Sequence, residues 1–138
     1  MIHVRNVLHS LRICVAFLFW PALGLVIWGS LAAISDPILG LGMSFEDLIV
    51  HFTAYGGLAG MAAIALKDRR RLVPALLGLV VLGGVVEIAQ FYAGRDMSWA
   101  DALANACGVA SGGTLARAIV ERLRRRYDSL SQIEGQGP

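Results

Sequence analysis

The sequence predicts an all-α protein, an integral membrane four-helix bundle with both termini in the cytoplasm. The composition, four apolar runs of helical length and a one-sided distribution of basic residues support this prediction. Of the 138 residues, 57% are apolar and 16% are charged, whereas soluble domains hold roughly 45–50% apolar and 25% charged residues. The mean hydropathy of +0.65 agrees. We therefore expect lipid to be the solvent of a single domain covering residues 1–138.

The first apolar run predicts a retained membrane span over residues 13–34. Arg5 and Arg12 precede it, as basic residues also precede a signal peptide. A signal peptide, however, has an apolar core of about 7–15 residues, whereas a span needs about 20. Pro21 predicts a kink in this helix, because proline lacks the backbone donor. Residues 35–46 hold an Asp-Pro pair and two glycines, which predict an external loop.

The second and third apolar runs predict a helical hairpin with spans over residues 48–66 and 72–92. The short basic sequence KDRRR joins them and ends the second helix abruptly. Pro74 falls in the first turn of the third helix, where a missing donor costs little. Gly56 and Gly60 form a GxxxG pattern, which allows a second helix to approach closely.

The fourth run predicts a span over residues 98–120, followed by a polar cytoplasmic tail over 121–138. Ser98 and Asp101 have the spacing of a capping-box variant at the helix start, and capping competes with a nucleophilic role for Ser98. The glycines Gly108 and Gly112 predict close packing with another helix. The tail is basic and then rich in polar residues and glycine, which predicts a short helical extension and a frayed end.

Basic residues predict the orientation of the bundle. Lysine and arginine in short loops favour the cytoplasmic side of a membrane. With four spans, one side holds Arg5, Arg12, Lys67, Arg69, Arg70, Arg71, Arg117, Arg122, Arg124, Arg125 and Arg126. Only Arg95 falls on the other side. We therefore expect both termini in the cytoplasm and the segments 35–46 and 93–97 outside.

The same topology brings polar residues from three predicted helices to the outer end of the bundle. Ionisable groups inside a membrane face the protein interior or a wet cavity and mark functional sites. We therefore predict an outward-facing polar pocket. Its candidate ligand-binding residues are Asp47, His51, Tyr55, Glu87, Gln90, Arg95, Ser98, Asp101 and Asn105.

Each of these residues also has a structural interpretation. His51 can relay protons, since histidine titrates near neutrality, or it can lock the helices through hydrogen bonds. Glu87 can present a protonated carboxyl to a ligand, or it can bond to Gln90 or to the fourth helix. Arg95 can hold a phosphate or carboxylate with its guanidinium fork, or it can form an ion pair with a nearby aspartate. The residue types alone leave these alternatives open.

Several functional classes find no support in the sequence. There is no basic patch with interleaved aromatic residues, so nucleic acid is not an expected partner. Cys14 and Cys107 lie inside apolar runs, where packing is the expected role. No cysteine or histidine cluster has the spacing of a zinc site, so neither a metal nor a cofactor is predicted. Metal-assisted hydrolysis by His51, Glu87 and Asp101 stays open as an alternative without a diagnostic spacing.

The polar residues resemble the pattern of the VanZ-like family of small bacterial membrane proteins, whose namesake is a teicoplanin-resistance protein. The matching residues span about half the chain. This sequence differs from the family at two positions: it has Leu48 where family members often have lysine, and Ala93 where they often have proline. The pattern is Asp47-x3-His51-x3-Tyr55, then Glu87-x2-Gln90, then Arg95-x2-Ser98-x2-Asp101-x3-Asn105-x2-Gly108-x3-Gly112. The resemblance implies a multi-pass protein of the bacterial cytoplasmic membrane, with a role in the cell envelope and in glycopeptide resistance.

Two functions from different classes follow from these observations. In the first, the pocket binds an envelope lipid, a lipid-linked cell-wall precursor or a glycopeptide, without catalysis. In the second, the protein is a membrane-embedded hydrolase or transferase that uses His51, Glu87 and Asp101 as its catalytic residues. A small proton-coupled exporter is the third interpretation, although its site would be expected nearer the membrane midplane.

Overall fold

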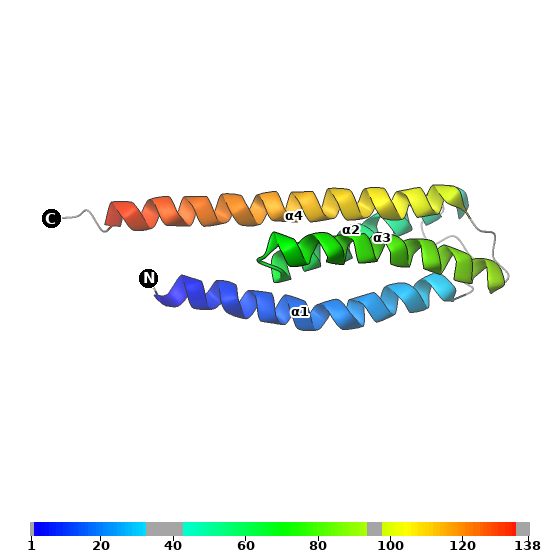
Figure 1. Cartoon of the computed structure of the whole chain (residues 1–138), viewed down its shortest axis with the longest axis horizontal. Coiled ribbons are helices and arrows are strands. Elements are labelled where there is room, and N and C mark those ends of the chain that lie inside the picture. The colour runs from blue at the N-terminus through cyan, green and yellow to red at the C-terminus, as the bar shows by residue number, and fades with distance from the viewer. Residues whose placement is uncertain (1, 33–42, 94–97, 135–138) are drawn as a thin grey trace.

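The computed structural model describes residues 2–32, 43–93 and 98–134. The regular structure of these ranges is entirely helical, with α1 (Ile2–Leu31), α2 (Met43–Ala65), α3 (Arg69–Tyr92) and α4 (Trp99–Glu134). Figure 1 shows the four helices running side by side along the long axis of the molecule. The predicted all-α four-helix fold is confirmed.

Three of the four helices are long and apolar enough to cross a membrane. Their spanning segments are Val7–Leu31, Phe45–Ala65 and Arg69–Tyr92. The fourth predicted span, over residues 98–120, lies inside α4, which is not among these three. The described helices are therefore those of a membrane protein. That α4 also crosses the membrane, and that both termini lie in the cytoplasm, remain predictions.

The helices extend beyond several of the predicted boundaries. α1 begins at Ile2, well before the predicted span, and α2 begins at Met43, inside the segment predicted as an external loop. α4 continues to Glu134, whereas the sequence predicted only a short helical extension before a frayed tail. Arginine, leucine and glutamate in this part favour helix. An ion pair between Arg117 Nε and Glu121 Oε1 at 2.8 Å adds support at i,i+4 spacing.

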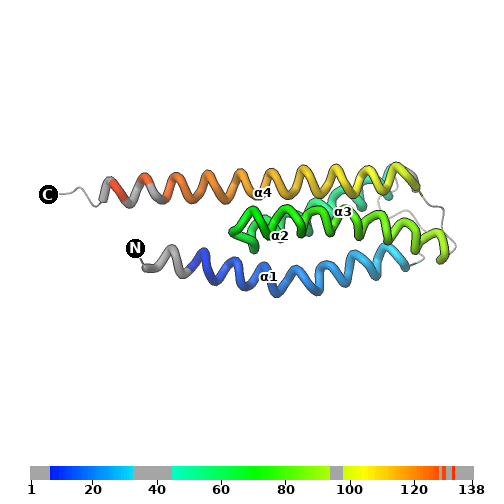
Figure 2. The backbone as a smooth tube through the Cα atoms, in the orientation of Figure 1, coloured from blue at the N-terminus to red at the C-terminus, as the bar shows by residue number. Residues whose placement is uncertain are grey.

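The helices alternate in direction, so both ends of the chain lie at the same end of the bundle. In Figure 1, the start of α1 and the end of α4 extend past the short connection between α2 and α3. α1 is bent midway along its length (Figure 2), and it contains Pro21, so the structure agrees with the predicted kink. The described basic side chains that the sequence assigned to the cytoplasm all belong to segments at this end.

The connection between α2 and α3 is held by two polar contacts. Asp68 is the N-cap of α3, and its Oδ1 accepts a hydrogen bond from the Arg70 backbone nitrogen at 2.9 Å. Arg117 of α4 donates from Nη1 to the Lys67 carbonyl oxygen at 3.1 Å, just beyond the end of α2. A capping side chain and a cation at the preceding helix end satisfy backbone groups that the helices leave unpaired.

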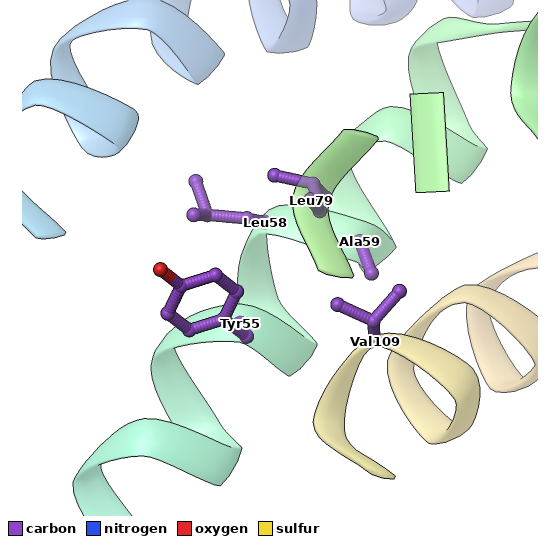
Figure 3. Close-up of a cluster of buried hydrophobic side chains, with 5 residues drawn as sticks. All are labelled: Tyr55, Leu58, Ala59, Leu79 and Val109. Atoms are coloured by element: carbon purple, nitrogen blue, oxygen red, sulfur yellow. The ribbon is translucent and has the colours of Figure 1, made fainter. Parts of the chain in front are cut away.

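The interior of the bundle combines alanines with a few larger apolar side chains, while many large apolar side chains lie on its outside. The two buried apolar clusters are Tyr55, Leu58, Ala59, Leu79 and Val109, and Ala62, Ala63 and Leu72. Figure 3 shows that the first cluster joins α2, α3 and α4. By contrast, Trp20 and Trp28 are 69% and 67% exposed. This distribution is expected in lipid, where apolar side chains gain little from burial and small residues allow close packing.

Glycines bring α2 and α4 into backbone contact. A Cβ atom added to Gly108 would collide with the Phe52 carbonyl oxygen, and one added to Gly112 would collide with the Gly56 carbonyl oxygen. Gly60 is less crowded, since its nearest neighbours would lie 3.8 Å away. The predicted packing role of Gly108 and Gly112 is confirmed, and Gly56 supplies the backbone against which Gly112 lies.

The two cysteines do not pack in the interior. Cys14 and Cys107 are free thiols, and both are exposed on the surface of the bundle. The expectation that they fill space between helices is wrong, because an apolar run does not show which of its faces turns inward. In a membrane, their small apolar side chains would face lipid without a large cost.

Candidate functional site

A buried polar cluster lies between α2, α3 and α4. It consists of His51, Glu87, Asp101 and Asn105, which are 6%, 3%, 9% and 1% exposed. His51 comes two turns after the start of α2, Glu87 lies in the last two turns of α3, and Asp101 and Asn105 lie in the first two turns of α4. Because α3 runs opposite to α2 and α4, these positions meet at one end of the bundle, within about 12 Å of the helix ends along the axis.

His51 is the centre of this cluster. Its Nδ1 lies 3.0 Å from Asn105 Oδ1 and 3.6 Å from Glu87 Oε1. In the tautomer that carries a hydrogen on Nδ1, His51 donates this hydrogen bond to the amide oxygen, which only accepts. One ligating atom from each of His51, Glu87 and Asp101 lies within 4.8 Å of the others. The structure thus brings together four residues that the sequence placed on three separate helices.

Asn105 is fitted closely against the backbone of α3. A Cβ added to Gly83 would be 3.0 Å from Asn105 Cβ and 3.1 Å from its Nδ2. While Oδ1 contacts His51, Nδ2 has no hydrogen-bond partner among the described residues. A buried donor without a partner costs about 1–3 kcal/mol. The arrangement therefore holds a donor that a further group in the cluster could satisfy.

Tyr55 lies one turn after His51 and is fully buried. Its ring belongs to the apolar core, but its hydroxyl points away from Val109 (Figure 3). The phenol is within electrostatic range of Glu87, and within the described part of the chain its oxygen has no hydrogen-bond partner. Tyr55 therefore offers a second buried polar atom next to the cluster.

Gln90 and Ser98 each make a hydrogen bond with a backbone group. Gln90 is buried, and its Nε2 donates a hydrogen bond to the Ser30 carbonyl oxygen at 2.8 Å, which ties α3 to α1. Ser98 Oγ accepts from the Asp101 backbone nitrogen at 3.3 Å. The capping interpretation of Ser98 is thereby confirmed, and its hydroxyl is engaged at the start of α4.

The two remaining candidates are Asp47 and Arg95. Asp47 is half-buried one turn before His51, and it is not among the three residues whose ligating atoms converge. Arg95 lies outside the described residues, so its predicted contact with an anion stays a prediction.

Glu46 is a buried acidic residue that sequence reasoning missed. It is 3% exposed in the first turn of α2, although the sequence placed it in an external loop. Its angular position differs from that of His51 by about 140° around the helix, so the spacing that selects His51 and Tyr55 does not select it. An acidic residue in a first turn is common because it complements the helix dipole, and this gives no signal of burial.

The predicted outward-facing pocket stays a prediction, because residues 33–42 and 94–97 lie outside the described residues. A depression of about 270 Å³ on the surface is lined by Leu48, Ile49, Phe52 and Ala104, all apolar. It includes none of the polar cluster. The polar side chains of the cluster are packed between α2, α3 and α4.

Comparison of the chain with protein-family models, with curated proteins and with solved structures finds no match. The resemblance to the VanZ-like family therefore stays an expectation from the sequence pattern. The chemistry of the site has to be argued from its own residues.

Proposed function

We propose that this protein is a small multi-pass protein of the bacterial cytoplasmic membrane that binds the polar part of an envelope molecule in its buried cluster. The candidate ligands are an envelope lipid, a lipid-linked cell-wall precursor and a glycopeptide. The observation that carries the proposal is the convergence of His51, Glu87 and Asp101 from three helices beside Asn105. No cofactor is required for this binding.

Burial of such groups needs an explanation beyond helix packing. Ionisable side chains inside a membrane are costly and rare, whereas a polar contact between membrane helices contributes only about 0.6–2 kcal/mol. If the cluster only locked the helices, its polar atoms would be expected to satisfy one another. Asn105 Nδ2 and the Tyr55 hydroxyl have no such partner among the described residues. A ligand carrying phosphate, carboxylate or hydroxyl oxygens would supply acceptors for both.

The location of the cluster supports access from outside the cell. The described basic side chains lie toward the other end of the bundle, which the distribution of lysine and arginine assigns to the cytoplasm. In this orientation both termini are cytoplasmic, and the cluster faces the outer leaflet. The resemblance to the VanZ-like family agrees with an envelope ligand and adds glycopeptide resistance as a possible outcome of binding.

The binding proposal can be tested by measuring which lipids stay with the purified protein. The full chain would be extracted in mild detergent and washed, and the retained lipids would be identified by native mass spectrometry. We expect retention of an envelope lipid or precursor by the wild type and at least tenfold less by Asn105→Ala. Thr53→Ala is the matched control, because Thr53 is exposed on α2 and its hydroxyl bonds only to its own helix.

Equal retention by Asn105→Ala and Thr53→Ala would contradict the proposed site. Glycopeptide binding would be measured separately, with labelled teicoplanin and the same pair of variants. Far-ultraviolet circular dichroism would show whether each variant keeps its helical content.

The geometry of His51 favours a second candidate function, a hydrolase or transferase that acts on a lipid-linked envelope substrate. Its imidazole is oriented by Asn105 and lies 3.6 Å from Glu87, as a general base with a carboxylate partner would. The other residues suggest no protein nucleophile, since Ser98 caps α4 and Cys107 is exposed away from the cluster. A water nucleophile would be needed. Product analysis after incubation with lipid-linked precursors would separate this function from binding alone.

A further inference from the structure

We propose that His51, Glu87 and Asp101 together hold a divalent transition-metal ion, with Zn²⁺ as the best candidate. The three residues come from three different helices, and their ligating atoms already lie within 4.8 Å of one another. This inference deepens the proposed function, because the ion would occupy the cluster to which a ligand is proposed to bind. It would supply a positive charge for a phosphate or carboxylate group of that ligand.

The set of donor atoms suits zinc. One imidazole nitrogen and two carboxylate oxygens are common zinc ligands, at about 2.0–2.2 Å from the ion. Two ligands at that distance in a tetrahedral site are about 3.4 Å apart. Atoms that are at most 4.8 Å apart would therefore have to move closer by at most about 1.4 Å. Side-chain rotation of Glu87 and Asp101 can supply such a movement without displacing a helix.

The charge of the site also suits a divalent ion. Two ionised carboxylates and a neutral imidazole balance two positive charges, which lowers the cost of holding them in a medium of low dielectric constant. Imidazole favours zinc and later transition metals, whereas sites made only of carboxylates favour magnesium, calcium or manganese. The single histidine among the three ligands is therefore the reason to prefer Zn²⁺ over Mg²⁺.

Asn105 gives a second and independent indication of a ligand at this position. It is 1% exposed, and its side chain reaches the cluster with Oδ1 at 3.0 Å from His51 Nδ1. Its Nδ2 has no hydrogen-bond partner among the residues that the structure describes. A zinc site with three protein ligands keeps an open position for water or substrate, and an oxygen bound there could accept from this donor. The neighbouring Tyr55 hydroxyl could serve in the same way.

The sequence left a metal role of these three residues open, because they have no diagnostic spacing. Short ligand spacings such as those of zinc fingers arise when one loop or helix supplies several ligands. Here each helix supplies one ligand, so only the packed helices show that the three ligating atoms converge.

Metal content of the purified full chain tests the proposal directly. The protein would carry a tag without histidine, and it would be incubated with Zn²⁺, desalted and measured by mass spectrometry of the elements, with no lipid added. We expect close to one zinc per chain in the wild type and at least tenfold less in Glu87→Gln and in Asp101→Asn. Glu121→Gln is the matched control, because it removes one acidic charge from an exposed position on α4 and should keep full occupancy.

A second measurement covers the case in which a variant fails to fold. Wild-type protein loaded with Co²⁺ should show the visible absorption of a four-coordinate nitrogen and oxygen site, and Zn²⁺ but not Mg²⁺ should raise its melting temperature. Absence of both effects in the wild type would overturn the proposal. Equal zinc content in Glu87→Gln and Glu121→Gln would overturn it as well, by showing adventitious binding only.

The metal and the ligand proposals can fail separately. Lipid retention would be repeated on chelator-treated protein. Retention without zinc binding would refute the metal site and leave the binding function standing. Zinc binding without retention of any envelope lipid or glycopeptide would refute the binding function and leave the metal site standing.

Discussion

Substitution of Gly112 by alanine should weaken the bundle where α2 and α4 are closest. The added Cβ would collide with the Gly56 carbonyl oxygen and would also lie 2.6 Å from Gly56 C and 2.8 Å from Gly56 Cα. Ordinary van der Waals contacts begin at 3.4 Å, and each of these three neighbours is backbone. The side chain therefore cannot be accommodated by rotation, and the two helices have to separate locally.

The size of the effect can be estimated from this geometry. Moving Gly56 to an ordinary distance requires a shift of about 1 Å, and a gap of 0.5–1 Å weakens each neighbouring contact by about a quarter to a half. Insertion of one carbon into a well-packed interior typically costs about 1–3 kcal/mol. Alanine also improves helix propensity over glycine by up to about 1 kcal/mol. A control that has the propensity gain without the collision is therefore needed.

Gly57→Ala provides this control, because nothing lies within 4 Å of a Cβ added to Gly57. Both variants would be unfolded reversibly by titration with sodium dodecyl sulfate in mixed micelles, with far-ultraviolet circular dichroism as the readout. We expect Gly112→Ala to be less stable than Gly57→Ala by about 1–3 kcal/mol. Equal unfolding midpoints for the two variants would refute the close approach of α2 and α4.

Three further predictions concern other contacts of the bundle. Gly83→Ala should lower the stability by about 1 kcal/mol relative to Gly84→Ala in the same titration, since only the first adds a Cβ that crowds Asn105, 3.0 Å from its Cβ. Gln90→Leu keeps a side chain of similar size but removes the hydrogen bond to α1; we expect a loss of about 0.6–1.7 kcal/mol, and an unchanged midpoint would argue against this tie. Asp68→Ala should cost about 1 kcal/mol through the lost N-cap of α3, whereas Asp68→Asn should be nearly neutral in thermal unfolding; equal effects would speak against capping.

Much of the secondary structure was predictable because lipid imposes simple requirements on sequence. A spanning segment has to be apolar over about 20 residues and has to satisfy its backbone internally, so apolar runs separated by polar turns predict helices. The hairpin of α2 and α3, the cap at Ser98 and the packing role of Gly108 and Gly112 were predictable in this way. The helix ends were less predictable, because hydropathy measures the part in lipid and not the whole helix.

The sequence by itself determined the order of the helices and the central part of each, and that the polar residues gather at one end of the bundle. Only the tertiary structure decided that His51 meets Asn105 and Glu87, that Gln90 turns to α1, that Glu46 is buried, and that Cys14 and Cys107 face outward. The physical reason is rotation about the helix axis. In lipid, an apolar face does not reveal whether it points inward or outward. The rotation is set by close contacts such as those of Gly108 and Gly112, which depend on the backbone of another helix.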